Sequence, residues 1–173
     1  MPILALIAST ALFWLAYWFI RMGGVDQVSE ALSQRRAAAR KAEAREIERL
    51  APLQAVDDPR DAAAILMVLV ARVDHDPSRE HVAAIERAMH DVLGFAHDLT
   101  ARLTHARFIA GRADRFEEAV ALFGDLLNKS LTLDEKWQLV EMVEAIAAVE
   151  GPSEGQTEAI KVLKRRIGLS PAC

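Results

Sequence analysis

The side chains best suited to chemistry gather in one short stretch, the turn at residues 74–81. Four of them can ligate a metal through carboxylate or imidazole groups: Asp74, Asp76, Glu80 and His81. Carboxylates with imidazole suit Zn, Mn or Ni, whereas carboxylates alone suit Ca or Mg. We therefore predict a chain without any cofactor, with a divalent-metal site at these four residues as the alternative.

A purely structural interpretation explains the same residues. Their spacing matches neither an EF-hand loop nor a zinc-binding helix. Asp74 and Asp76 can instead cap helix ends, with His75 and His81 in solvent. Three further histidines are scattered along the chain and are expected at the surface: His90, His97 and His105.

No motif indicates an enzyme. The chain has no nucleophile elbow, Walker loop, dinucleotide fingerprint or Cys/His pair. Its single cysteine, Cys173, excludes a disulfide framework and a cysteine-based zinc site. Residues 51–173 carry 14 Lys/Arg and 20 Asp/Glu, a net charge of −6, whereas residues 1–50 carry seven and five, a net charge of +2. From the missing motifs we predict a non-enzymatic protein. An acidic body does not suit the phosphate backbone of nucleic acid, so we also predict that nucleic acid is not a partner.

The N-terminus has the composition of a membrane anchor. Residues 3–20 form an uncharged run of 18 residues, which spans about 27 Å as a helix and matches a bilayer core. Aromatic side chains cluster at its end, as in an interfacial belt: Trp14, Tyr17, Trp18 and Phe19. No basic residue precedes the run, which argues against a cleaved signal peptide. We predict that residues 1–22 span the bilayer once.

Basic residues follow the predicted anchor and set its orientation. The positive-inside rule places that side in the cytoplasm of a bacterial inner membrane, with the N-terminus outside. These residues are Arg21, Arg35, Arg36, Arg40, Lys41, Arg45 and Arg49. Residues 23–56 are predicted as a charged helical connector. Within the anchor, Ala5 and Ser9 form a short strip of small residues that could pack against a partner helix.

The remaining residues, 57–173, read as an all-helical domain. Asp58 before Pro59 is typical of a helix start, and the very apolar run 62–73 suits a buried core helix. Further helices are expected from Pro77 or Ser78 to Gly94, at 98–110 and at 114–128. Two capping boxes, Thr132 with Glu135 and Ser153 with Gln156, open the last two helices. Among the apolar residues, Val92, Phe108 and Trp137 are expected to pack in the core, with a groove as the alternative for Trp137.

A weak internal repeat links two parts of this domain. Residues 70–94 and 143–168 follow the same order: an apolar helix, an acidic residue, a short turn with a helix cap, a second helix, and an apolar residue followed by glycine. The first unit offers Ala71, Asp74, Ser78 and Glu80. The second offers Ala148, Gly151 and Ser153, and it closes with Ile167-Gly168-Leu169-Ser170.

Over roughly residues 60–170 these features resemble the TerB-like domain, which is named for tellurite-resistance proteins and occurs in the membrane-anchored co-chaperone DjlA. The departures are His75 for glycine, His81 for an acid, Glu150 for aspartate, and Gln156 or Thr157 for an acid. No J domain is present.

The resemblance implies a compact helical bundle associated with membranes and stress systems. The leading hypothesis is a single-pass, membrane-anchored TerB-like interaction or scaffold module in envelope or metal-ion stress. It would contact the lipid bilayer and a membrane-protein partner of unknown identity. The alternatives are a divalent-metal sensor that uses the turn 74–81, and an accessory subunit of a larger inner-membrane complex.

Overall fold

The computed structural model describes residues 45–169, and every element in that range is a helix or a connection between helices. The all-α prediction is confirmed there. The chain divides into two units, Met1–Ile47 and Glu48–Cys173. No helix within residues 45–169 combines the length and the apolar character needed to cross a membrane. The predicted anchor, residues 1–22, and most of the connector lie outside the described residues.

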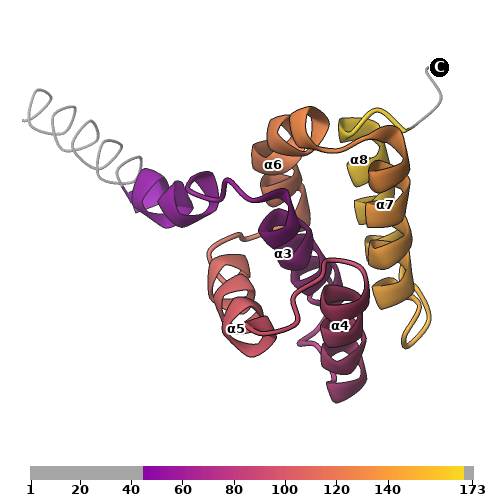
Figure 1. Ribbon diagram of the computed structural model, residues 1–173. Coiled ribbons are helices and arrows are strands. Elements are labelled where there is room, and N and C mark those ends of the chain that lie inside the picture. Colours follow the sequence, from indigo (N-terminus) through magenta and orange to yellow (C-terminus); the bar gives the residue numbers. More distant parts are fainter. Residues whose placement is uncertain (1–44, 170–173) are drawn as a thin grey trace, which may run out of the picture. The chain divides into compact units, whose positions relative to one another are not determined.

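Residues 45–54 are helical, and six further helices follow (Figure 1). In chain order they are α3 (Pro59–Ala71), α4 (Arg79–Asp91), α5 (Leu99–Ala110), α6 (Phe116–Ser130), α7 (Leu133–Ala147) and α8 (Glu154–Arg166).

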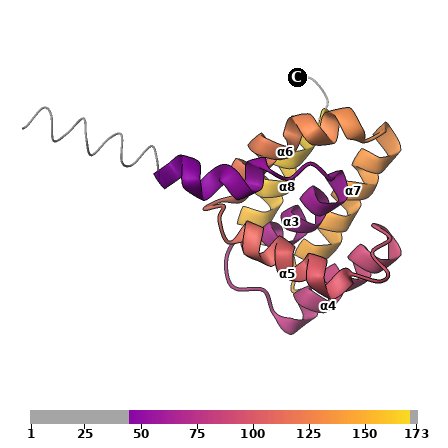
Figure 2. The same cartoon turned by 60° about the vertical axis from the view of Figure 1, so that its left-hand side comes forward.

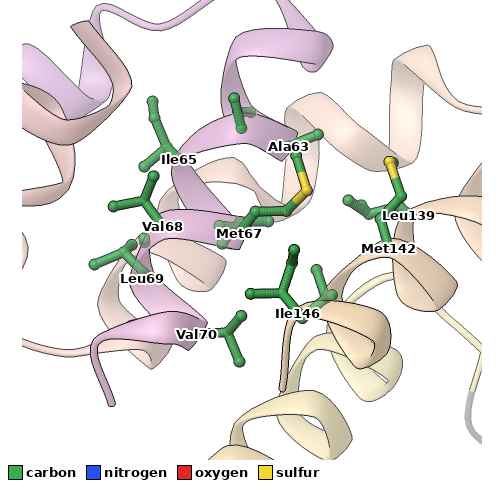
Figure 3. Close-up of a cluster of buried hydrophobic side chains, with 14 of the residues drawn as sticks. Ala63, Ile65, Met67, Val68, Leu69, Val70, Leu139, Met142 and Ile146 are labelled. Carbon is green, nitrogen blue, oxygen red and sulfur yellow. The ribbon is translucent and has the colours of Figure 1, made fainter. Parts of the chain in front are cut away.

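The helix α3 lies at the centre of the bundle and is buried on every side. All ten residues from Ala62 to Ala71 are at most 5% exposed. The helix contacts α5, α6 and α7 most extensively, and Figures 1 and 2 show those three helices around it. Figure 3 shows Met67 and Val70 of α3 facing the α7 residues Leu139 and Ile146. A helix that is apolar all round must be buried. The core prediction for 62–73 is therefore confirmed for residues 62–71, whereas Arg72 is exposed and Val73 is half-buried beyond the end of α3.

The predicted helix starts form as local chemistry requires. The Asp58 carboxylate accepts a hydrogen bond from the Arg60 backbone N–H at 2.8 Å and caps α3. Both predicted capping boxes are present, at Thr132 for α7 and at Ser153 for α8. Of the two predicted starts for α4, Ser78 is the residue that caps the helix, which begins at Arg79.

Three apolar residues lie outside the core. Val92 is 40% exposed, Phe108 56% and Trp137 44%, so none of the three packs in the core, and for Trp137 the groove alternative stays a prediction. On α7 the buried side chains are Leu139, Val140, Met142, Val143, Ile146 and Ala147. Trp137 is on a different side of the helix from these residues.

Gly124 lies in the middle of α6, and the side chain of Arg166 from α8 lies directly over it. A Cβ atom at Gly124 would collide with the Nε and Cγ atoms of Arg166. The Arg166 guanidinium then reaches Asp125 at 3.0 Å. This close approach explains a glycine that helix propensity alone would disfavour.

Candidate functional site

The two turns of the internal repeat lie side by side in the structure. One turn joins α3 to α4 and the other joins α7 to α8. Ser153 Oγ donates a hydrogen bond to the Asp74 carboxylate, and Gln156 Nε2 donates to the Val70 carbonyl at 3.1 Å. A Cβ atom at Gly155 would lie 2.9 Å from Val73 Cγ1, so only glycine allows this approach. We call this region, residues 74–81 and 148–156, the paired turns.

Glu150 of the second turn faces two histidines of the first unit. Its carboxylate oxygens lie 3.5 Å from His75 Nε2 and 3.7 Å from His81 Nδ1. The two imidazole rings meet edge to face, with centroids 6.0 Å apart. The side chains of His75 and Glu150 are 53% and 45% exposed, whereas His81 is 1% exposed. The arrangement therefore combines one buried imidazole with two half-exposed side chains.

His81 is held in place by the residue that caps its own helix. Ser78 Oγ accepts a hydrogen bond from the His81 backbone N–H at 3.3 Å and lies 2.8 Å from His81 Nδ1. The other ring nitrogen, Nε2, is buried without a hydrogen-bond partner in the part of the chain that the structure describes. His81 is thus a core residue, and the expectation that it lies in solvent is wrong.

The structure does not gather the four predicted metal ligands around one point. Asp74 is turned toward Ser153, whereas Asp76 lines a separate surface hollow of about 270 Å³ beside Arg72 and Arg107. Glu80 is exposed in the first turn of α4. Within residues 45–169, no three His, Cys, Asp or Glu side chains form a group arranged to hold a metal ion. Metal binding therefore stays a prediction.

In the sequence, Glu150 stands out only because it replaces the aspartate of the TerB-like pattern. Its place between His75 and His81 follows from the packing of turns about 70 residues apart in the chain. The repeat was the available signal, because aligning its two units puts Glu150 opposite Asp74. Gln156 was likewise noticed only as a capping residue, although its side chain also bonds to α3.

A second candidate surface lies on the outward side of α7. Leu133 and Trp137 are one helical turn apart and are 63% and 44% exposed. Elsewhere, a narrow notch of about 150 Å³ opens between α7 and the ends of α3 and α4, with Val92, Leu93 and Met142 in its lining. Large exposed apolar side chains that cluster mark surfaces used for binding.

Ion pairs connect the helices that surround α3. Arg49 donates two hydrogen bonds to Glu118, at 2.6 Å and 3.1 Å, and they hold the pKa of that carboxyl below its usual value. Arg102 joins Asp98 and Asp61, and its guanidinium stacks 4.5 Å from the Phe95 ring centroid. The hydrogen bond from Arg102 lowers the pKa of Asp98. These contacts are structural.

Comparison with protein-family models, curated proteins and solved structures finds no match to this chain. The TerB-like resemblance therefore stays a prediction drawn from the residues themselves.

Proposed function

We propose that this chain is a non-catalytic, membrane-anchored interaction or scaffold module with a TerB-like helical body on the cytoplasmic side of a bacterial inner membrane. It would recruit a membrane-protein partner in the response to envelope or metal-ion stress. The observation that carries the proposal is the exposed pair Leu133 and Trp137 on α7. Exposed tryptophan is enriched among the residues that dominate binding energy at interfaces.

Affinity purification of the full-length protein from native membranes in mild detergent, read by mass spectrometry, tests this function. We expect a stoichiometric partner that is lost in the Trp137→Ala variant. Phe108→Ala is the matched control, because Phe108 is another large aromatic residue with a similar exposed fraction, on a different helix. A protein that purifies alone, in the wild type as in both variants, would reject the proposal.

A second candidate function is divalent-metal sensing at the paired turns. It would use Asp74, Asp76, Glu80 and His81 of the turn 74–81, whose carboxylate and imidazole groups are ligands that divalent ions take. Titration calorimetry of the full-length protein with Zn, Mn, Ca and Mg tests it, with Asp76→Asn as the variant expected to lose binding. Neither heat nor a thermal shift with any of these ions would rule it out.

The accessory-subunit hypothesis depends on Ala5 and Ser9, which lie outside the described residues. If the strip packs against a partner helix, Ser9→Leu should disrupt co-purification of the complex while Trp137→Ala leaves it intact. An unchanged complex in Ser9→Leu would argue against this function.

A further inference from the structure

Apolar and acidic side chains share the outward surface of α7. Trp137 has Leu133 four residues before it, Asp134 three residues before it and Glu141 four residues after it. Residues three and four apart are neighbours on a helix surface. All four are exposed. We call these four residues the α7 surface.

The two carboxylates of the α7 surface are not engaged elsewhere. Neither Asp134 nor Glu141 has an ion pair or a hydrogen bond to its carboxylate within residues 45–169. By contrast, the Glu135 carboxylate closes the capping box, and Glu144 pairs with Lys164 at 2.6 Å. The helix dipole accounts for Asp134, which lies in the first turn, but not for Glu141 in the middle of the helix. Two negative charges thus flank an exposed indole.

We propose that the α7 surface binds a basic amphipathic helix of a partner protein. Apolar side chains of that helix would cover Leu133 and Trp137, and its Lys or Arg side chains would reach Asp134 and Glu141. The Trp137 ring also offers a face for a cation, since tryptophan is the best aromatic partner for ammonium and guanidinium groups. This inference rests on the proposed function and specifies the chemistry of the partner.

The negative charge of Asp134 and Glu141 disfavours the other partners that could cover the α7 surface. An anionic lipid surface or an acidic peptide would meet two uncompensated carboxylates. A second copy of the body, with a net charge of −6 over residues 51–173, would be repelled in the same way. A basic helix satisfies both the charge and the exposed apolar area.

Phe108 provides a comparison of opposite charge within the same molecule. It is 56% exposed, and the Arg112 guanidinium lies 5.0 Å from its ring centroid. A basic helix should therefore avoid this site, although the exposed aromatic area is similar.

Site-specific photo-cross-linking of the full-length protein in its native membranes tests the proposal. An aromatic photo-reactive residue replaces Trp137 in one variant and Phe108 in the other, and the cross-linked peptides are sequenced. We expect position 137, and not position 108, to yield peptides that carry Lys or Arg together with apolar residues at helical spacing. Acidic or neutral peptides, peptides of this chain itself, or equal yields at both positions would overturn the proposal.

Neutralising the two carboxylates gives a second test in the same membranes. Asp134→Asn with Glu141→Gln should lower the yield at position 137 about three- to tenfold, the effect of losing two exposed charge pairs. Glu86→Gln, an exposed acid on α4, is the control and should change nothing. A partner that co-purifies through Trp137 but carries no basic helix would overturn the inference and leave the proposed function standing. The absence of any partner would remove both.

Discussion

At the scale of single residues, His81 is the side chain whose surroundings satisfy it least. Its Nδ1 meets Ser78, but its buried Nε2 has no partner among the described residues. A buried polar group without a hydrogen bond costs about 1–3 kcal/mol relative to a satisfied one. Its ring nevertheless fills core space, because the side chain is 1% exposed.

The two roles of His81, polar and space-filling, can be separated by substitution. His81→Phe keeps a ring and removes the unsatisfied nitrogen, so the free energy of unfolding should stay within about 1 kcal/mol of wild type. His81→Ala should lower it by about 2–3 kcal/mol, because the change leaves a cavity. Chemical denaturation of both variants measures the difference. If the phenylalanine variant is as unstable as the alanine variant, the polar contacts of His81 matter more than its volume.

Glu118 links stability to pH through its contact with Arg49. The hydrogen bonds from Arg49 lower the pKa of Glu118 from its usual 4.5 in the folded protein. A carboxyl whose folded pKa is depressed stabilises the fold above its unfolded pKa, and that contribution disappears as the pH falls through the folded pKa. Glu118→Gln should therefore be less stable than wild type at pH 7, and the gap should close below pH 4.5.

Denaturation curves across this pH range check the prediction. Glu141→Gln is the matched control, because Glu141 is exposed and has no partner within residues 45–169. That variant should follow wild type at every pH. A gap between Glu118→Gln and wild type that persists at low pH would show that the loss does not come from the carboxylate charge.

At the scale of elements, two helix starts use the same capping box but have different surroundings. Among the described residues, the Thr132 side chain bonds only within the capping box of α7, whereas the Ser153 side chain caps α8 and also donates to Asp74 across the paired turns. The difference in stability between alanine variants at Thr132 and Ser153 therefore measures the hydrogen bond between Ser153 and Asp74.

Replacing each capping residue with alanine should reveal that contact. Thr132→Ala should cost about 1 kcal/mol of unfolding free energy, the usual cost of a lost cap. Ser153→Ala should cost about 1 kcal/mol more, because it also removes a hydrogen bond to a charged group. Thermal denaturation compares the variants, and in an Asp74→Ala background the excess should vanish. Equal losses for Thr132→Ala and Ser153→Ala would mean that the cross-turn bond adds no stability.

The helix starts could be predicted from sequence because capping is local. Asp58, Thr132 and Ser153 each bond to a backbone group two or three residues ahead. The buried helix α3 was equally predictable, since its apolar character leaves no exposed side. Exposure at Phe108 and Trp137 was not, because it depends on which sides of α5 and α7 their neighbours cover.

The candidate site was less predictable than the helices. The sequence draws attention to the turn 74–81, but the contacts of this turn with Glu150 and Ser153 connect residues more than 65 positions apart. Spacing along one segment cannot reveal such pairs. The side-chain directions that separate Asp74 from Asp76 likewise depend on the packed turns.

At the scale of the whole molecule, stability and recognition lie on different residues. The core surrounds α3, where Leu66 is fully buried, whereas Leu133 on the α7 surface is 63% exposed. Leu66→Ala should lower the free energy of unfolding by about 3 kcal/mol through cavity formation. Leu133→Ala should change it by less than about 0.5 kcal/mol while weakening partner binding.

Denaturation and co-purification measured on the same two variants test this separation. Leu133→Ala should fail in co-purification at unchanged stability. A Leu133→Ala variant that unfolds as readily as Leu66→Ala would show that the α7 surface belongs to the folding core instead.

The central position of α3 also has a consequence for synthesis on the ribosome. This helix is made first among the six, yet part of its covering, α7, is complete only at Ala147. At about 5–20 residues per second, its apolar surface waits several seconds for that cover. During this interval the nascent chain presents an all-apolar helix, which is the kind of segment that chaperones bind and that aggregates when they are scarce.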